Sequence, residues 1–417
     1  MKHARMQKEE CHIHQDKYMY VGTVRNGGSI KGNGEGIFCV FQSKDGTMEV
    51  KGLLKGNSLS CLCKGKGNMI YAVSETKDFN GLNGSGGGVV ACSIQEDGSL
   101  KQISSTVSYG SRPCHLTITH DGRYLLVANH GSHTTVTCSY QKTEDGSYEL
   151  VRGFDDSSIA MFSLEADGSI GKLCDLVVLK GKGYWCHGGG QSTSHVHCVI
   201  EDHGKVIACN RGTDEIVVYT IENDRLKPLS SYHTPNGYAP RNAIMHPSSA
   251  VFYVLFENYP VIGVYSLSED GSVEQMHMIG TMEAAFYQTH PLPVHLRRHA
   301  DKDEVNTCAM FDHSLPMGSI LKITSDGTTL YAANRSYCSS GSISVYRIDC
   351  TGMLKLIQVK EVNGGDIRGF EVDEENRCII VGIMDGGRIV MMPIEEDGTL
   401  RDEISSCSIP APSCIVL

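Results

Sequence analysis

Hydrophobic and polar residues alternate along most of the chain in runs of about five to eight, which is the pattern of half-buried β-strands. The segment 325–349, SDGTTLYAANRSYCSSGSISVYRID, is representative. It contains an Asp-Gly turn, a strand that ends at Arg335, a loop of Ser and Gly, and a second strand. Helix caps followed by a 3.6-residue periodicity are hard to find. The pattern predicts an all-β protein.

This unit recurs along the chain, and each copy ends in a turn that contains Asp. Seven units of roughly 40–50 residues, each with four short strands, are typical of a β-propeller. We therefore predict a seven-bladed β-propeller over residues 18–417, an N-terminal extension over residues 1–17, and an insertion at about 289–315. A second insertion is expected near 143–156. The terminal turns lie at Asp45, Asp97, Asp167, Asp224, Asp270, Asp349 and Asp397.

The two ends of the repetitive region are complementary. The last six residues, PSCIVL, resemble the beginning of a repeat such as PCHLTI, whereas the segment from Tyr18 begins with the piece that comes second in a repeat. We predict that the C-terminal strand is the innermost strand of the N-terminal blade and that it closes the ring without free edges. Separate β-sandwiches would have no use for such ends.

Composition limits the choice of partners. The formal net charge of -11 argues against nucleic acid, so any anion site must be a local cluster of cations. The sequence has no apolar run of signal-peptide or membrane-span length, and we expect a cytoplasmic protein without a membrane partner. The 17 cysteines are scattered through the strands, as expected of free thiols in a reducing compartment. No cofactor is indicated, and the sequence does not indicate an oligomeric state.

Propeller topology predicts where a site would lie. The start of the first strand and the end of the second strand of each unit lie on the same face, and seven units bring these positions to the mouth of one channel. The starts carry His115, His195, His197, Arg241 and Arg368, and the ends carry Glu75, Asn129, Arg211, Glu257 and Arg335. Arginine binds anions through paired N–H donors, and a nearby carboxylate or imidazole can move protons. The set predicts a site for a small anionic molecule.

Two other interpretations apply to individual members of this set. Under the first, a side chain serves only to satisfy a strand end or to bridge neighbouring blades. His195 and His197 share one face of a regular strand, which would suit a metal, but no third ligand is assured. We therefore expect no metal and assign these imidazoles to substrate contact or proton transfer.

Several motifs in the same order and spacing resemble those of the seven-bladed lactonase family, which includes propeller-type 6-phosphogluconolactonases and carboxy-cis,cis-muconate cyclases. The resemblance covers nearly all of residues 18–417. It rests on YVGT (20–23), PCHLTITHDGRYLLVAN (113–129), SHVH (194–197), APRN (239–242), FEN (256–258), LYAANR (330–335) and IRGFEV (367–372).

The resemblance implies which residues are catalytic. By motif, the family's histidine, arginines and glutamate correspond to His195 or His197, Arg241, Glu257 and Arg335. The other residues that topology brings to the mouth are expected to contact the substrate: Glu75, His115, Asn129, Arg211 and Arg368. The step of 16 residues from Arg241 to Glu257 suits one strand, a turn and a returning strand. Two departures concern the substrate: Asn242 replaces the histidine of a GPRH-like motif, and Arg211 lies in a DLG-like segment.

The activity implied by the resemblance is hydrolysis of a phosphorylated sugar lactone such as 6-phosphogluconolactone. Arg335, with Arg241 or Arg368, would hold the anion and the developing oxyanion, while Glu257 or an imidazole would activate water. Two alternatives remain at this stage. One is a cycloisomerase that adds a carboxylate across a double bond of a muconate-like diacid, and the other is a non-catalytic propeller that binds a protein partner.

Overall fold

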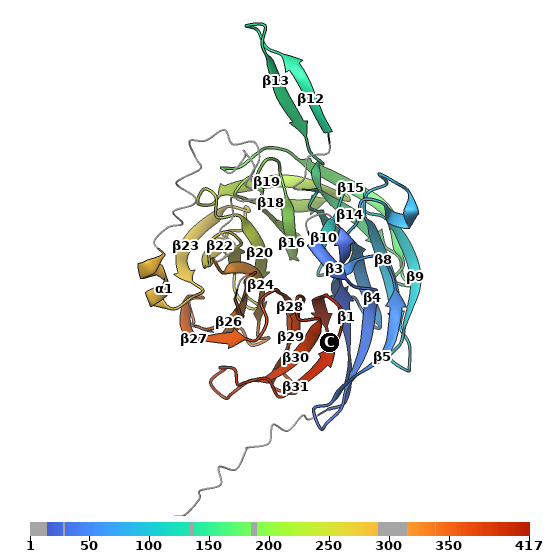
Figure 1. Ribbon diagram of the computed structural model, residues 1–417, viewed down its shortest axis with the longest axis vertical. Coiled ribbons are helices and arrows are strands. Elements are labelled where there is room, and N and C mark those ends of the chain that lie inside the picture. The colour runs from blue at the N-terminus through green and yellow to red at the C-terminus, as the bar shows by residue number, and fades with distance from the viewer. Residues whose placement is uncertain (1–14, 28–29, 133–136, 185–189, 291–314, 338) are drawn as a thin grey trace, which may run out of the picture.

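The computed structural model describes residues 15–27, 30–132, 137–184, 190–290, 315–337 and 339–417. Seven four-stranded antiparallel sheets surround a central axis (Figure 1). Blade 1 has the strand order β32-β1-β4-β5, blade 2 is β6-β7-β8-β9, and blade 3 is β10-β11-β14-β15. Blades 4 to 7 are formed by consecutive sets of four strands from β16 to β31. The predicted seven-bladed propeller is confirmed.

Each blade is built outward from the axis. The innermost strands are β32 (Pro412–Val416), β6 (Leu59–Lys64), β10 (Pro113–Ile118), β16 (Val196–Asp202), β20 (Pro240–Met245), β24 (Met317–Ile323) and β28 (Ile367–Asp373). The second strands are β1 (Lys17–Thr23), β7 (Met69–Ser74), β11 (Tyr124–Asn129), β17 (Lys205–Asn210), β21 (Val251–Phe256), β25 (Thr329–Arg335) and β29 (Cys378–Ile383).

The outer half of each blade is a second antiparallel pair. The third strands are β4 (Gly36–Gln42), β8 (Gly88–Ile94), β14 (Ser157–Leu164), β18 (Glu215–Glu222), β22 (Val261–Leu267), β26 (Gly341–Ile348) and β30 (Arg388–Pro393). The fourth strands are β5 (Met48–Lys55), β9 (Leu100–Val107), β15 (Ile170–Leu179), β19 (Arg225–His233), β23 (Val273–Gly280), β27 (Leu354–Val362) and β31 (Ser405–Ser408).

The turns that contain Asp join the third strand of each blade to the fourth. In blade 1, Asp45 Oδ1 accepts the backbone N–H of Thr47 at 2.9 Å, and Gly46 adopts a φ of 83° that glycine tolerates best. The equivalent turn of blade 4 has no glycine, and Asn223 and Asp224 adopt the positive φ values that it requires, 51° and 59°. The repeated turn signal in the sequence therefore marks the outer hairpin of each blade.

A tyrosine on the second strand of several blades binds the outer turn of the next blade. The hydroxyl of Tyr20 in blade 1 donates to Gly98 O in blade 2 at 3.0 Å, and Tyr331 in blade 6 donates to Gly398 O in blade 7 at 2.9 Å. Tyr71 and Tyr253 make the equivalent bonds. These bonds fix the rotation of one blade against its neighbour and satisfy a hydroxyl that packing has removed from water.

The hydrophobic core lies between the blades. Seven clusters of buried side chains each combine residues from two adjacent sheets, so that every blade packs on both neighbours. The cluster between blades 7 and 1 contains Met19, Val21 and Ile415 beside Ile380 and Ile389. Alternation along the strands supplies one apolar face to each neighbour, which explains why the sequence contains short strands rich in β-branched residues.

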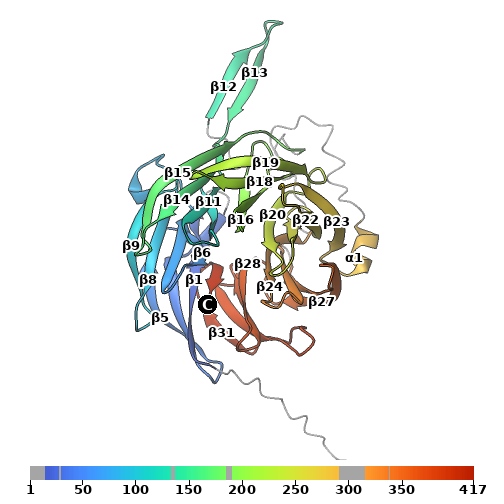
Figure 2. The ribbon, with the colours of Figure 1, turned by 180° about the vertical axis from the view of Figure 1, so that it is seen from behind.

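The ring is closed by pairing of the two ends of the propeller. Strand β32 runs antiparallel to β1, with Tyr20 opposite Val416 and Val21 opposite Ile415. Figure 2 shows the C-terminus beside β1, on the inner side of blade 1. The predicted closure is therefore confirmed, and β32 is the innermost strand as expected.

Further elements extend from the ring. The insertion expected near 143–156 is a hairpin of β12 (Thr137–Lys142) and β13 (Tyr148–Gly153), which projects from blade 3 (Figure 1). A second hairpin, β2 (Arg25–Gly27) with β3 (Ile30–Asn33), follows β1. The described residues also contain the short helices η1 (Phe79–Gly81) and α1 (Ala284–Thr289). No helix within the described ranges is long and apolar enough to cross a membrane. Most of the expected 289–315 insertion and of the 1–17 extension lies outside the described residues.

Ring closure makes β32 a sensitive part of the core. Ile415 is 1% exposed, and we expect Ile415→Ala to lower the free energy of unfolding by about 3 kcal/mol, because it leaves a cavity between blades 7 and 1. Urea unfolding monitored by circular dichroism measures this change. The matched control is Ile404→Ala, where the side chain is 49% exposed and the expected change is below about 0.5 kcal/mol. Equal effects of the two variants would contradict the closure.

Candidate functional site

Each innermost strand carries a β-bulge at the same position. In β16, Val196 pairs with Asn210 and Cys198 pairs with Cys209, so His197 has no partner in the ladder. The pairing of the other six innermost strands skips one residue in the same way. A bulge redirects a side chain that would otherwise follow the alternation of the strand. The seven skipped residues, called the bulge ring here, are Ser60, Cys114, His197, Arg241, Ser319, Arg368 and Ser413.

A second set of equivalent positions follows the end of the second strand. The backbone N–H of Glu257 donates to Ala239 O at 2.9 Å, directly before the innermost strand, and blades 1, 2, 3, 4 and 7 form the same bond. In blade 6 the corresponding residue, Arg335, pairs with Met317 within the ladder. This strand-end ring consists of Val24, Glu75, His130, Arg211, Glu257, Arg335 and Met384. The two rings together hold most of the predicted site residues.

In blade 3 the strand-end position is one residue away from the predicted Asn129. Asn129 pairs with Pro113 inside the sheet and is 0% exposed, and its amide nitrogen donates to Ser108 O at 2.9 Å and Ser158 Oγ at 3.1 Å. Its side chain therefore holds strands together instead of reaching the mouth. The strand-end residue of blade 3 is His130, which the sequence prediction missed. Aligning the repeats on their strand pairing, rather than on the last strand-like residue, would have identified it.

Three blades meet at Glu257. Its carboxylate contacts Arg211 Nε at 2.7 Å from blade 4, Arg335 Nη2 at 2.5 Å from blade 6, and Arg241 Nε at 3.5 Å from its own blade. All four residues are at most 7% exposed. Arg241 also donates to the backbone carbonyl of Ser319 in the bulge ring. The prediction that Arg241, Glu257 and Arg335 converge is thus confirmed, and Arg211 joins them.

The three arginines determine the ionisation state of the Glu257 carboxylate. Burial alone would raise the pKa of Glu257, but the guanidinium groups of Arg211, Arg335 and Arg241 outweigh it and hold the pKa well below its usual value. Burial and the charge of Arg335 lower the pKa of Arg241 to about 10, which still leaves it charged at neutral pH. Three cations against one anion leave a net positive site in a chain of net charge -11. Glu257 therefore orients the arginines as a permanent anion.

Three histidines form the adjoining wall. His130 stacks on His195 with ring centroids 4.6 Å apart, and the ring of His197 meets His130 edge-on at 5.4 Å. His195 is 0% exposed and shares a hydrogen bond with His130 O through Nδ1 at 2.9 Å, whereas His197 is only partly buried. Burial lowers the pKa of all three, that of His195 to about 3, so the imidazoles are neutral at pH 7. His197 is the partly exposed member of the three.

The arrangement of the histidines differs from the regular strand assumed from sequence. His195 lies before β16 and His197 lies at its bulge, and the ring of His130 contacts both. No group of three or more His, Cys, Asp or Glu residues in the described part of the chain is arranged to hold a metal ion. The arrangement suits proton transfer by a neutral imidazole beside cations.

A second group of polar residues comes from blades 2 and 7. Arg368 donates from Nε to Asp366 Oδ2 at 3.0 Å and from Nη2 to Tyr337 Oη at 3.1 Å. The guanidinium of Arg335 lies over the ring of Tyr337, 5.7 Å from its centroid, so this tyrosine connects Arg368 to the Glu257 cluster. Burial raises the pKa of Glu75, although the charge of Arg368 opposes the shift. Glu75 and Arg368 therefore belong to the same charged mouth.

His115 also links two blades. It is the residue after the bulge of β10, and its Nδ1 accepts the backbone N–H of Val199 in blade 4 at 3.4 Å. Its Nε2 lies 3.6 Å from Cys198 Sγ, and burial lowers its pKa to about 4. The equivalent Asn242 accepts the N–H of Leu321 in blade 6 at 2.8 Å. These side chains bridge neighbouring innermost strands, which was the alternative interpretation.

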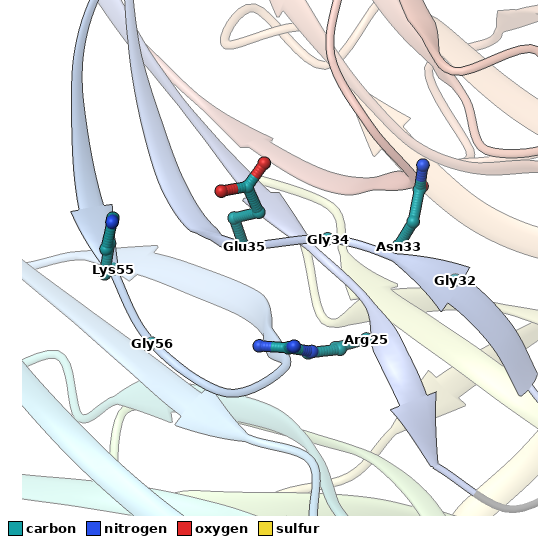
Figure 3. Close-up of a pocket in the computed structure, with 7 residues that line it drawn as sticks. All are labelled: Arg25, Gly32, Asn33, Gly34, Glu35, Lys55 and Gly56. Atoms are coloured by element: carbon teal, nitrogen blue, oxygen red, sulfur yellow. The ribbon is translucent and has the colours of Figure 1, made fainter.

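A pocket of about 660 Å³ lies apart from these residues, beside blade 1 (Figure 3). Arg25, Glu35 and Lys55 supply its charged side chains, and the rest of its wall comes from Gly32, Asn33, Gly34 and Gly56. None of the residues predicted from the sequence contributes to this pocket. The candidate site is therefore the mouth formed by the two rings.

Comparison with known proteins identifies relatives along the whole propeller. Residues 18–417 match a family model described as a seven-bladed β-propeller lactonase. The chain is 24% identical over 408 residues to a 6-phosphogluconolactonase of Bacillus subtilis, covering 96% of this chain and 98% of that protein. It is 23% identical over 387 residues to a 6-phosphogluconolactonase of Formosa agariphila, covering 89% and 91%.

Solved structures share the fold at low sequence identity. A periplasmic gluconolactonase of Pseudomonas aeruginosa superposes with a TM-score of 0.76 at 19% identity, covering 96% of this chain and 99% of that chain. A protein from Lactobacillus plantarum gives a TM-score of 0.73 at 18% identity, with the same coverage. These likenesses support the seven-bladed architecture.

The arginine cluster predicts a pH-dependent loss of stability. Glu257→Gln removes the anion between three buried cations, and we expect it to lower the free energy of unfolding at pH 7 by about 3 kcal/mol or more. Because the pKa of Glu257 is depressed on folding, its contribution is present above the ordinary value of 4.5 and is lost as the pH falls further. The difference between wild type and variant should therefore narrow in acid.

Thermal and urea unfolding between neutral and acidic pH measure this difference. The control is Glu49→Gln, which removes a carboxylate that is 64% exposed and paired with Lys51, and which should change stability by less than about 0.5 kcal/mol. Added sulfate should partly restore the Glu257→Gln variant, because it can take the place of the lost negative charge beside the guanidinium groups. If Glu257→Gln proved as stable as the wild type at neutral pH, the three arginines would not depend on the Glu257 carboxylate, and the description of the cluster would be wrong.

Proposed function

Because the chain belongs to the seven-bladed β-propeller lactonase family, we propose that it hydrolyses the ring ester of a phosphorylated sugar lactone resembling 6-phosphogluconolactone. The observation that carries this proposal is the cluster of Arg211, Arg241 and Arg335 around Glu257, next to a neutral imidazole. Cations aimed at one point suit the negative charge that develops on a carbonyl oxygen during ester hydrolysis. The names of the relatives in Bacillus subtilis and Formosa agariphila agree with this substrate class.

We assign the proton transfer to His197. Its imidazole is neutral and partly exposed in the bulge ring, so it can take the proton of a water molecule that attacks the carbonyl carbon. Collapse of the tetrahedral intermediate breaks the ring C–O bond, and the same proton passes to the departing oxygen. Glu257 is less suited to activate water because its buried carboxylate is already engaged by Arg211, Arg241 and Arg335. It acts instead by orienting Arg241 and Arg335.

The charge distribution supports an anionic substituent on the substrate. Arg368 lies in the bulge ring, and Tyr337 connects it to Arg335, so it can bind a second negative group while Arg241 and Arg335 hold the lactone carbonyl. In a chain of net charge -11, this concentration of guanidinium groups favours an anion at the mouth over other parts of the surface. A phosphate on the sugar would supply the second group.

The first test concerns His197. We expect His197→Gln to lower kcat for lactone opening by about 10²- to 10⁴-fold, because the general base is removed while the arginines remain. Since burial holds the pKa of His197 well below 6.5, wild-type activity should be flat near neutrality and fall only in more acidic buffer, when the imidazole becomes protonated. The variant should lack this acidic decline.

Rates are measured by proton release and corrected for spontaneous ring opening. His203→Gln is the matched control, because that side chain is 72% exposed and should leave kcat unchanged. An unchanged kcat in His197→Gln would remove the histidine from the proposal. Failure of the wild type to exceed the spontaneous rate with any sugar lactone would overturn the proposed hydrolysis itself.

The second test concerns the phosphate. Arg368→Met keeps the apolar stem but removes the guanidinium, and we expect it to lower kcat/KM for a phosphorylated lactone by about 10- to 100-fold. The loss for the corresponding lactone without phosphate should be severalfold smaller. Equal losses for both substrates would show that Arg368 does not recognise the phosphate, without affecting the assignment of lactone hydrolysis.

A further inference from the structure

Two cysteines meet where the ring closes. Cys414 lies on β32 in blade 1 and Cys61 lies on β6 in blade 2, and each is the first residue after the bulge of its strand. Cys414 Sγ accepts the backbone N–H of Leu62, the residue after Cys61, at 3.3 Å and lies 3.6 Å from Leu62 O, so the Cys414 thiol lies against the backbone next to Cys61. Figure 2 shows β6 next to β1 near the C-terminus. The contact therefore joins the first complete blade after the N-terminus to the last strand of the chain.

These two thiols differ from the cysteines that serve as small core residues. Cys39, Cys92 and Cys209 are at most 2% exposed within the apolar clusters, whereas Cys61 and Cys414 are only partly buried. Both lie on the innermost strands of adjacent blades, and their partial exposure leaves them open to a small oxidant. Partial exposure and proximity therefore occur together at this pair.

The charged surroundings favour a thiolate on Cys414. The hydrogen bond from Cys61 and the ammonium of Lys322 on β24 lower the pKa of Cys414, against the opposing effects of burial and Glu371. Lys322 is paired with Glu371 Oε2 on β28 at 2.5 Å. The pKa of Cys61 is raised, first by its interaction with Cys414, so Cys414 loses its proton more readily than Cys61. This asymmetry is common in thiol pairs that react in two steps.

We propose that Cys61 and Cys414 are a redox-active pair that a hydroperoxide converts to a disulfide across the ring closure. The Cys414 thiolate attacks the terminal oxygen of the peroxide, an S–O bond forms, the O–O bond breaks, and an alcohol or water leaves. Cys61 then attacks the sulfenic sulfur, the S–S bond forms and water is released. The peroxide gains two electrons and the two thiols lose two, so the step is balanced.

The disulfide would change how the ring is held. In the reduced protein the closure depends on the hydrogen bonds between β1 and β32 and on apolar packing. A covalent bond between residues 61 and 414 would enclose most of the chain in one loop and restrict the unfolded state. Oxidation should therefore stabilise the closed propeller, independently of the proposed lactone hydrolysis.

Peptide mapping of the full-length protein tests this inference. The reduced protein is treated with hydrogen peroxide, the remaining thiols are blocked, and the sample is digested without reductant. We expect a mass that links the peptide containing Cys61 to the peptide containing Cys414, its loss after treatment with dithiothreitol, and a midpoint of thermal unfolding a few degrees higher in the oxidised protein. Absence of the linked peptide in the folded, peroxide-treated wild type would overturn the proposal.

Single substitutions separate the two thiols. In Cys61→Ser the sulfenic acid on Cys414 should persist and react with dimedone, whereas Cys414→Ser should abolish both the adduct and the link. Cys63→Ser is the matched control, because Cys63 lies on the same strand and burial raises its pKa. It should leave the link unchanged. A link in which Cys63 replaces Cys61, or one that survives Cys414→Ser, would contradict the assignment.

Discussion

The antiparallel pairing of β32 with β1 is the interaction on which the rest of the molecule depends. It joins the last strand of the chain to the first blade, so that all seven sheets have a neighbour on both sides. Each apolar cluster can then form between two blades. The site requires the same closure, because its residues come from blades on different parts of the circle.

The candidate site is formed by local irregularities that recur in every blade of the propeller. A bulge at the same place in each innermost strand redirects one side chain, and the residue that follows the second strand is held by a backbone hydrogen bond beside it. Serine at some of these positions and arginine or histidine at others give the mouth its uneven charge. Burying three arginines would be unfavourable alone, but Glu257 offsets them and fixes their orientation. The arginines also hold the pKa of this carboxylate low, which is why the proposed proton transfer is assigned to the neutral imidazole of His197.

Much of this architecture was predictable because short-range patterns specify it. Alternation of apolar residues, Asp-containing turns and complementary ends predicted the blades and their closure, and a simple rule about strand ends predicted that Arg241, Glu257 and Arg335 converge. The errors arose one residue away from correct positions. Asn129 was chosen in place of His130 because both lie at the end of an apolar strand, but the Asn129 side chain is buried in hydrogen bonds to Ser108 and Ser158.

What could be predicted from the sequence and what could not differ for a physical reason. Sequence alone specified the seven-bladed fold and the residue types available at its mouth, because strand periodicity, turn chemistry and repeat length are local properties. Folding in three dimensions determined which of those side chains enter the channel, since a bulge shifts the alternation by one residue without a distinct local signal. It also determined their charge states. The low pKa of Glu257 and the neutrality of His197 result from burial and from arginines contributed by other blades, which lie far away along the chain.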